Sequence, residues 1–284
     1  MHHIRRFAAC HPLAMDLGTI GIWRSKRHGA GITGEIEALG YGALWIGGSP
    51  SVAEARPFLE ASRSFTVATG ILNVWRHEAR DVAAEHAQVR EEFPGRFLLG
   101  IGIGHPEATS EYRKPLAKMR AFFDGLDEGG VAREERVAAA LGPKMLDLAA
   151  ERSLGTHPYF VPVEHTRFAR ERVGDGVLVA PEVAVVVEPD TDTARRIARE
   201  YAASYLRMSN YTSNLLRLGF TEADIANGGS DRLIDAVIPH GTAEEVAEAI
   251  RDHLAAGADH VCLQPLGHGP EPLDDYRALA RALL

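Results

Sequence analysis

The stretch FTVATGILNVW, from Phe65 to Trp75, joins a buried strand to an unusual ending. Residues Phe65–Ile71 are apolar on both faces, as in a strand that is covered on both sides. A strand that merely stops does not require Gly70, a branched apolar residue and then Asn73. The stretch therefore predicts a strand of an α/β fold whose C-terminal end has a second role.

Similar short apolar runs recur along the chain and alternate with helical segments. We expect strands at Thr19–Trp23, Ala43–Gly47, Phe65–Ile71, Phe97–Ile103, Arg136–Leu141, His157–Val161, Leu178–Val187 and His260–Gln264. The helices expected between them include Val52–Ala61, Arg80–Glu92, Leu116–Leu126 and Ala243–Ala255. Strands that alternate with helices in this way predict a (β/α)8 TIM barrel, with residues 1–284 forming one domain. The long segments after the fourth and seventh strands, 106–135 and 191–235, predict helical insertions that wall an active site.

Composition narrows the class of protein. The 284 residues are 45% hydrophobic and carry a formal charge of −8, which argues against a nucleic-acid surface. No apolar run approaches the roughly 20 residues that span a bilayer, and the N-terminus lacks the continuous apolar region of a signal peptide. Two cysteines, Cys10 and Cys262, fit a reducing compartment. We therefore expect a cytoplasmic protein without membrane or nucleic-acid partners.

Motifs of several reaction classes are missing. The sequence GIGIGH at 100–105 has His105 where a dinucleotide fingerprint needs its last glycine. His77-Glu78 is not followed by the second histidine of a zinc site, and we expect no metal. There is also no GxSxG nucleophile motif and no P-loop. A bound organic cofactor that brings its own reactivity is the better expectation.

In a parallel barrel, the C-terminal ends of the strands form the functional face. Glycine occurs at several of these ends, including Gly47, Gly70, Gly104 and Gly142. Glycine allows the backbone to approach a flat ligand closely, although a simple turn explains any one of these glycines equally well. The obvious titratable side chain at a strand end is His105, which is either structural or catalytic.

With these strand ends in place, the chain resembles the luciferase-like monooxygenase superfamily of (β/α)8 barrels, and within it the coenzyme F420-dependent oxidoreductases. The matching segments occur in the family's order over about residues 17–266. They are LGYGALWIGGSP, VATGILNVW, FPGRFLLGIGIGHPE, ALGPKMLDLAAER, HPYFVPVEHT, LVAPEVAVVV and AGADHVCLQPL. The segments indicate the fold more specifically than the cofactor, because flavin and deazaflavin enzymes share this barrel.

The resemblance implies a set of site residues. A cis peptide at Gly70-Ile71 would support the cofactor ring, and other residues expected at the cofactor are Gly47, Asn73, Gly104 and His105. The loops after strands five and six would hold its phosphate, through Leu141, Gly142, Val161, His165 and Thr166. Trp23 and Trp75 are expected at the substrate. The alternatives are a trans turn at Gly70, an Asn73 side chain that bonds its own backbone, and ordinary helix caps in the two loops.

One departure from the family concerns acid–base chemistry. Related alcohol-oxidising enzymes carry a histidine after the second strand and a glutamate after the fourth, whereas this chain has Gly48, Ser49 and His105. His105 is thus the candidate catalytic residue. The resemblance implies an F420-dependent oxidoreductase that transfers hydride to or from a small organic substrate, and that forms a homodimer. The alternatives are an FMN-dependent monooxygenase and a barrel that binds a flavin or deazaflavin without turnover.

Overall fold

A computed structural model describes residues 15–110 and 112–284. These residues form one 11-stranded parallel sheet. Its strands are β1 (Ile20–Ser25), β2 (Ala43–Gly47), β3 (Thr66–Thr69), β4 (Leu72–Asn73), β5 (Phe97–Gly102), β6 (Arg136–Ala138), β7 (Gly155–Thr156), β8 (Leu178–Val179), β9 (Glu182–Val187), β10 (His240–Gly241) and β11 (Val261–Pro265). Their order is β10-β9-β11-β1-β2-β3-β5-β6-β7-β8, in which the strands from β1 to β8 lie side by side in chain order. β4 is off this path and continues β3 along β5.

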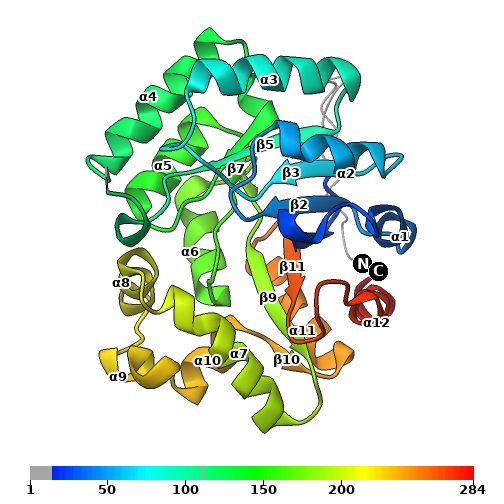
Figure 1. The fold of residues 1–284 in the computed structure, drawn as a ribbon. Coiled ribbons are helices and arrows are strands. Elements are labelled where there is room, and N and C mark those ends of the chain that lie inside the picture. Colours follow the sequence, from blue (N-terminus) through cyan, green and yellow to red (C-terminus); the bar gives the residue numbers. More distant parts are fainter. Residues whose placement is uncertain (1–14, 111) are drawn as a thin grey trace.

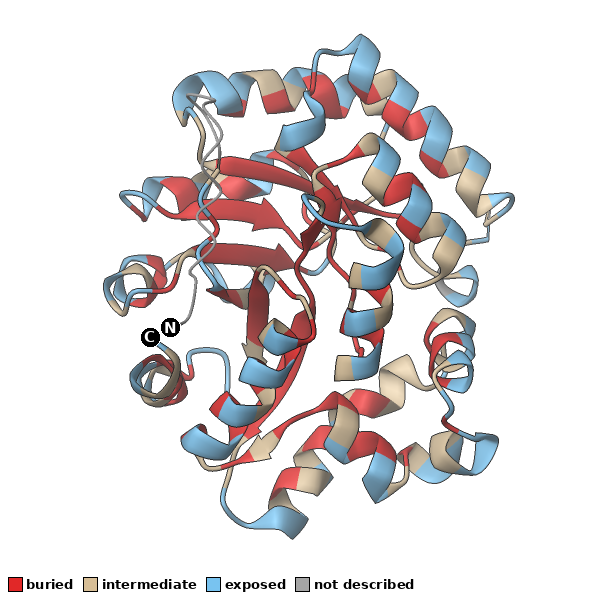
Figure 2. Ribbon diagram, turned by 180° about the vertical axis from the view of Figure 1, so that it is seen from behind, coloured by how far each residue is buried: buried red, intermediate tan, exposed pale blue. Residues whose placement is uncertain are grey.

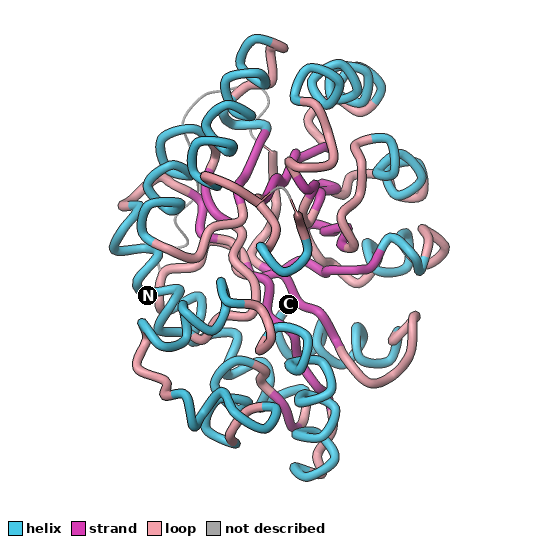
Figure 3. The backbone as a smooth tube through the Cα atoms, turned by 60° about the vertical axis from the view of Figure 1, so that its left-hand side comes forward, coloured by secondary structure: helices cyan, strands magenta, loops and turns pink. Residues whose placement is uncertain are grey.

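The sheet closes on itself through the segment that contains β8 and β9. Leu178 of β8 pairs with Gly155 of β7, while Glu182 of β9 pairs with Cys262 of β11. Between the two strands, the carbonyl of Pro181 accepts a hydrogen bond from the Cys262 N–H at 2.9 Å. These pairings close the parallel sheet and confirm the predicted barrel, and Figure 3 shows strands (magenta) in the middle of the molecule with helices (cyan) around them.

Helices surround this sheet and turn their exposed faces outward (Figures 1 and 2). They are α1 (Thr33–Ala38), α2 (Arg56–Glu60), α3 (Ala79–Glu92), α4 (Pro115–Glu128), α5 (Pro143–Arg152), α6 (Val163–Val173), α7 (Thr191–Tyr205), α8 (Ser209–Arg217), α9 (Glu222–Ile225), α10 (Asp231–Val237), α11 (Ala243–Ala255) and α12 (Leu273–Leu283). The Thr242–Glu245 capping box starts α11 at the predicted residue. No helix in the described ranges is long and apolar enough to cross a membrane.

The core has three parts. The largest lies between the strands and the surrounding helices and includes Ile22, Leu44 and Ile101. A smaller cluster fills the inside of the barrel, where Trp45 and Cys262 are fully buried. A third cluster joins α7, α8 and α10 to the loop at Phe160. This third cluster anchors the helices that follow β9 against the C-terminal end of the barrel.

The segments after the fourth and seventh barrel strands differ from each other. After β5, a 3-10 turn at Pro106–Ala108 leads into α4, which is itself the crossover to β6 rather than an added helix. After β9, the chain forms α7, α8, α9 and α10 before the crossover helix α11. In Figure 1, α7–α10 form a group at the end of the molecule away from α3 and α4. The helices added to the barrel therefore come from the segment after β9.

Three predicted strands need correction. The seventh, Leu178–Val187, forms two strands, β8 and β9. The sixth strand is Gly155–Thr156 and not His157–Val161, because Pro158 has no N–H for the ladder and Phe160 turns the chain with a φ of 50°. The third strand is interrupted after Thr69 and resumes at Leu72. At this interruption the Gly70-Ile71 peptide bond is cis, as the resemblance implied.

Candidate functional site

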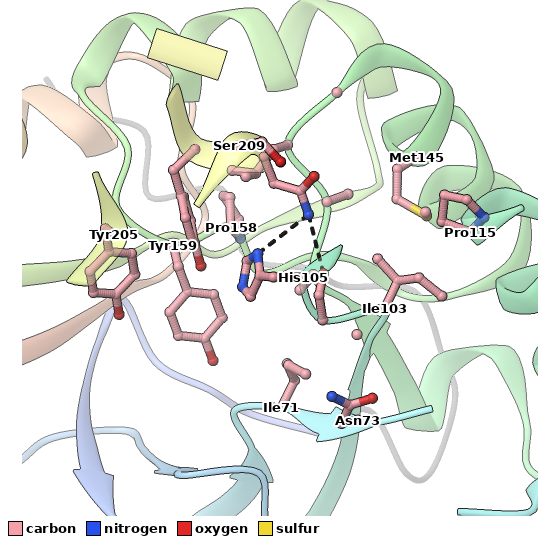
Figure 4. A pocket seen from close by; sticks show the side chains of 18 of the residues that line it. Ile71, Asn73, Ile103, His105, Pro115, Met145, Pro158, Tyr159, Tyr205 and Ser209 are labelled. Atoms are coloured by element: carbon pink, nitrogen blue, oxygen red, sulfur yellow. Dashed lines mark hydrogen bonds between the residues drawn. The ribbon is translucent and has the colours of Figure 1, made fainter. Parts of the chain in front are cut away.

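A cavity of about 500 Å³ opens at the C-terminal ends of the strands. Its lining comes from the loops after β1 through β7 and from α8, so residues distant in sequence meet there. The volume lies within the roughly 300–1,000 Å³ typical of small-molecule and cofactor sites. Predicted site residues in the lining are Trp23, Gly70, Ile71, Asn73, Gly104, His105, Leu141 and Gly142. Figure 4 shows several of them around the cavity.

One wall of the cavity is the interruption between β3 and β4. The Gly70 N–H donates to the Ile46 carbonyl at 2.7 Å, and the Trp23 indole N–H donates to the Gly70 carbonyl at 3.3 Å. The Ile71 side chain lies over Gly102, where a Cβ atom would approach Ile71 Cδ1 to 2.5 Å. Glycine at 102 is therefore needed for Ile71 to take this position, and this wall of the cavity consists of glycines and the apolar Ile71 side chain.

Asn73 combines the two roles considered from its sequence position. Its Oδ1 accepts a hydrogen bond from the Trp75 backbone N–H at 3.0 Å, the local contact of an Asn turn. Its Nδ2 lies 2.8 Å from the position that a Cβ would take at Gly104, which has a φ of 65°. In Figure 4 this amide nitrogen points toward Ile71. The amide group is thus held by the backbone and presents its N–H donors on the cavity side.

His105 lies on the cavity wall opposite Asn73. The Asn210 amide donates to His105 Nδ1 at 3.3 Å and to the Gly104 carbonyl at 3.2 Å, so α8 fixes the end of the fourth barrel strand. The imidazole packs against Tyr211, with 4.9 Å between ring centroids. Burial lowers the pKa of His105, and the Glu107 carboxylate only partly offsets this effect. At neutral pH the ring is therefore neutral, with Nδ1 as the acceptor.

The cavity has a cationic end. Arg217 of α8 lines it, and its Nη2 lies 3.8 Å from the position that a Cβ would take at Gly142. Gly142 is the N-cap residue of α5, whose first-turn N–H groups favour an anion. Arg217 donates to Asn214 Oδ1 at 2.8 Å, and no carboxylate of the described chain forms an ion pair with it. This end of the cavity can accept a phosphate group.

Five other predicted residues lie outside the lining and support it. Trp75 donates its indole N–H to the Ile103 carbonyl at 2.7 Å, and the Trp23 ring occupies the space where a side chain at Gly47 would stand. His165 is buried, and its Nε2 contacts the Leu141 carbonyl at 3.0 Å. Burial lowers the pKa of His165 to about 4, so the ring is neutral. Thr166 bonds His253 at 2.8 Å, and Val161 is buried.

Several lining residues were absent from the predicted set. Tyr159, Tyr205 and Tyr211 form an aromatic wall, to which α8 adds Ser209, Asn210 and Ser213. No sequence motif marks Tyr205 or Tyr211, and Tyr159 falls inside the strand predicted at His157–Val161. With that strand ending at Thr156, the strand-end rule would have placed Tyr159 on the functional face. The α8 residues had no sequence signal.

The residues present fit a flat, phosphate-bearing cofactor. Such a ring would lie against Gly70-Ile71 and the glycines of β5, with Asn73 at its polar edge, and its phosphate would reach Gly142 and Arg217. When bound, a deazaflavin supplies hydride transfer and a flavin supplies hydride transfer or oxygen chemistry. The described residues contain no group of three or more His, Cys, Asp or Glu side chains that could hold a metal ion.

The protein is an α/β barrel with a cavity of cofactor size at the C-terminal ends of its strands. Solved structures that share this fold include an F420-dependent secondary alcohol dehydrogenase in complex with an F420-acetone adduct, with a TM-score of 0.71, 16% identity, and coverage of 93% of this chain and 98% of that one. The coenzyme F420-dependent tetrahydromethanopterin reductase of Methanopyrus kandleri gives a TM-score of 0.70 at 13% identity, covering 94% and 99%.

A flavin-binding enzyme shares the fold to a similar extent. The oxygenating constituent of 3,6-diketocamphane monooxygenase of Pseudomonas putida, in complex with FMN, gives a TM-score of 0.66 at 13% identity, covering 94% and 96%. No protein-family profile and no curated protein sequence matches the chain. The resemblance to the luciferase-like superfamily and its F420 branch is thus confirmed as a likeness of fold.

Proposed function

We propose that this protein is an F420-dependent oxidoreductase that transfers hydride between the deazaflavin and a small organic substrate. The observation that carries the proposal is the wall at Gly70-Ile71, because it presents a glycine and an apolar side chain to a flat ring inside a cavity of suitable size. Both F420-dependent neighbours have the same fold over nearly their whole length. Within the site, Asn73 supplies amide donors, and His105 is the catalytic candidate in the lining.

The neutral His105 imidazole limits what this residue does in the proposed reaction. An uncharged ring with Nδ1 bonded to Asn210 orients a substrate by hydrogen bonding, or accepts a proton when an alcohol is oxidised. The phosphate would bind between Gly142 and Arg217, where a helix N-terminus meets a guanidinium. Trp23 and the tyrosine wall would contact the substrate.

Cofactor titration tests the proposal. Protein fluorescence is followed while purified protein is titrated separately with F420 and with FMN. We expect saturable binding of F420 at micromolar concentration and no binding of FMN. Binding of FMN alone would replace the proposal by the second candidate, an FMN-dependent monooxygenase, which the FMN-bound neighbour favours. Failure of both to bind would refute the assignment of the cavity to either cofactor.

Turnover separates an enzyme from a binding protein. Reduced F420 is mixed with the protein and a panel of ketones, enones and imines, and its oxidation is followed by absorbance. We expect at least one class to be reduced, whereas tight cofactor binding without any turnover would indicate a carrier. The homodimer expected from the resemblance is a separate proposal, tested by light scattering against the chain mass of 30.8 kDa.

A further inference from the structure

The first turn of α8 is bonded to the loop that carries His105. The Asn210 amide nitrogen donates to the Gly104 carbonyl at 3.2 Å and to His105 Nδ1 at 3.3 Å (dashed lines in Figure 4). Glu107 Oε1 accepts a hydrogen bond from the Ser209 backbone N–H at 2.9 Å. The helix and the loop are therefore joined through residues on both sides of His105, and its ring is held in one orientation.

The Gly104 carbonyl determines which atom of the Asn210 amide faces the ring. A carbonyl oxygen only accepts hydrogen bonds, so the amide group that contacts it is the NH2 group and not Oδ1. Reversing the amide would place Oδ1 against the Gly104 carbonyl, with two acceptors and no proton between them. The NH2 group has a second hydrogen for His105 Nδ1. Nδ1 is therefore an acceptor that carries a lone pair.

A neutral imidazole with a lone pair on Nδ1 carries its proton on Nε2. A proton added to Nδ1 would face the amide NH2 group, donor against donor, so this contact also disfavours the charged ring. The other groups around the ring are Tyr211 of α8, at 4.9 Å between ring centroids, and the carboxylate of Glu107. Burial lowers the pKa of His105, and Glu107 offsets this only in part. The hydrogen bond and the burial thus select the same state, the neutral Nε2–H tautomer.

Nε2 is the ring atom of His105 that is available to a ligand. It forms no hydrogen bond with any residue in the described ranges, and the side chain lines the cavity. In Figure 4 this nitrogen lies on the side of the ring away from the dashed line. An N–H group donates and cannot accept. It can therefore stabilise negative charge on a substrate oxygen, but it cannot remove the proton of an alcohol.

The rest of the lining favours an uncharged substrate. Among the lining residues of the described ranges, Arg217 is the only side chain that is charged at neutral pH, and it lies at the Gly142 end where the phosphate is proposed to bind. Beside His105 the wall is aromatic, with Tyr211 packed against Tyr205 at 4.8 Å between ring centroids. A charged substrate group would lose its hydration here without gaining a partner of opposite charge, which is costly.

We propose that Asn210 is a positioning residue that holds His105 as the Nε2–H tautomer, and that this N–H binds the oxygen of an uncharged aldehyde or ketone substrate. The inference rests on the proposed function, in which the reduced deazaflavin supplies a hydride. The new C–H bond forms as the carbonyl π bond breaks, and the π electrons move to the oxygen that is bonded to Nε2–H. The oxygen then takes a proton from water, and solvent neutralises the hydroxide that remains.

This assignment fits the departure from the alcohol-oxidising relatives. Gly48 and Ser49 line the cavity where those enzymes carry acid–base groups. Removal of an alcohol proton needs a base, whereas a carbonyl that receives hydride needs a donor at its oxygen. Of the two roles open to His105, the contact with Asn210 therefore selects hydrogen-bond donation.

The first test uses the full chain without cofactor. Histidines are labelled with nitrogen-15, the protonated ring nitrogens are identified by NMR at about pH 8, and His105→Gln assigns the His105 signals. We expect the His105 proton on Nε2. In Asn210→Asp a carboxylate accepts where the amide donated, so the proton should move to Nδ1 and the His105 pKa should rise by roughly 1–3 pH units. The exposed Asn227→Asp is the control and should change neither. A proton on Nδ1 in the unsubstituted protein would overturn the inference.

The second test uses the F420-loaded enzyme and a ketone that it reduces. His105→Gln keeps an amide N–H in place of Nε2–H, so its kcat should stay within roughly fivefold, whereas His105→Ala loses the donor. Asn210→Asp at about pH 9 should lower kcat by at least roughly tenfold and leave F420 affinity unchanged, with Asn227→Asp again as the control.

Two results of this second test would refute the inference. They are a kcat of Asn210→Asp equal to that of the unsubstituted enzyme, and a kcat of His105→Gln as low as that of His105→Ala. Absence of turnover in the unsubstituted enzyme would instead refute the proposed function, while the NMR result still reports which nitrogen of His105 carries the proton.

Discussion

At the scale of single residues, the site depends on side chains whose hydrogen bonds are made away from the cavity. Asn73 and His105 each direct one polar atom to a partner, Trp75 or Asn210, and keep a second one for a ligand. Such partners fix the rotamer, which reduces the entropy lost when a ligand binds. The two residues therefore lead to separate predictions about turnover and binding.

His105→Ala is expected to reduce turnover by roughly tenfold to a hundredfold and to leave cofactor affinity nearly unchanged. Because burial lowers the pKa of His105, its neutral form persists to lower pH than that of an ordinary histidine. We expect an acidic limb in the pH–rate profile below about 6.5, and expect His105→Ala to abolish it. His77→Ala, outside the lining, serves as the control. Undiminished kcat in His105→Ala would exclude a catalytic role.

Gly102→Ala tests the cofactor wall directly. The added Cβ would approach Ile71 Cδ1 to 2.5 Å, so Ile71 would have to move toward the cavity. We expect the F420 dissociation constant to rise by roughly tenfold or more, as a displaced wall costs contacts with the ring. Gly31→Ala, where the nearest atom to a Cβ is 3.9 Å away, is the control. Unchanged F420 affinity in Gly102→Ala would place the ring elsewhere.

At the scale of elements, loops that join helices to strands are fixed by buried or half-buried polar side chains. Glu37 of α1 accepts hydrogen bonds from the backbone N–H groups of Arg63, Ser64 and Phe65 at 2.9, 2.6 and 3.0 Å. These residues lead into β3, so one carboxylate holds the strand that ends at Gly70. The interaction links a helix on the outside of the barrel to the Gly70-Ile71 wall of the cavity.

Glu37→Ala should lower the free energy of unfolding by about 1–3 kcal/mol, because three backbone donors lose a charged acceptor. Burial raises the pKa of Glu37, but the hydrogen bonds from residues 63–65 outweigh this effect and hold the pKa below the ordinary glutamate value of 4.5. The contribution is therefore present above that value and is lost as the pH falls through the lower folded-state pKa. Urea denaturation at pH 7 and at about pH 3 measures both effects, with exposed Glu35→Ala as the control. Equal stability of Glu37→Ala and the unsubstituted protein at pH 7 would contradict the prediction.

Sequence patterns were reliable for elements whose ends have local signals. The helix predicted at Ala243–Ala255 has the same bounds as α11, and the strand predicted at Ala43–Gly47 has the same bounds as β2. The sixth strand, predicted at His157–Val161 but found at Gly155–Thr156, shows the limit of prediction from apolar patterns. HPYFVPV is apolar enough for a strand, yet Pro158 cannot donate to the ladder and Phe160 takes a positive φ, which apolar periodicity does not reveal.

At the scale of the whole molecule, the cavity draws on the C-terminal ends of six barrel strands and on α8. A ligand bound there links segments that are distant in sequence, so binding should stabilise the barrel as a unit. F420 at about 100 times its dissociation constant should add about 2.7 kcal/mol to the free energy of unfolding. This corresponds to a rise in Tm of roughly 5 °C, measured by scanning calorimetry.

Two controls accompany that measurement. FMN at the same concentration should leave Tm unchanged, and Gly102→Ala should lose most of the shift with F420. A rise in Tm with FMN and none with F420 would contradict the proposed cofactor. A shift with F420 that is fully retained in Gly102→Ala would indicate binding outside the cavity.

The sequence by itself determined the alternation of strands and helices, the family of barrels that the chain resembles, and the strand ends where the site lies. Each of these is a local property, set by hydrophobic periodicity, caps and glycines. Only the tertiary structure decided which of those residues line the cavity, because lining depends on side-chain direction and on packing between distant segments. It turned His165 and Thr166 inward as supports, and it brought Tyr159 and Arg217 to the site. The ending of FTVATGILNVW shows both levels: its sequence marks Gly70-Ile71 as special, and the closed barrel makes it a wall of the cavity.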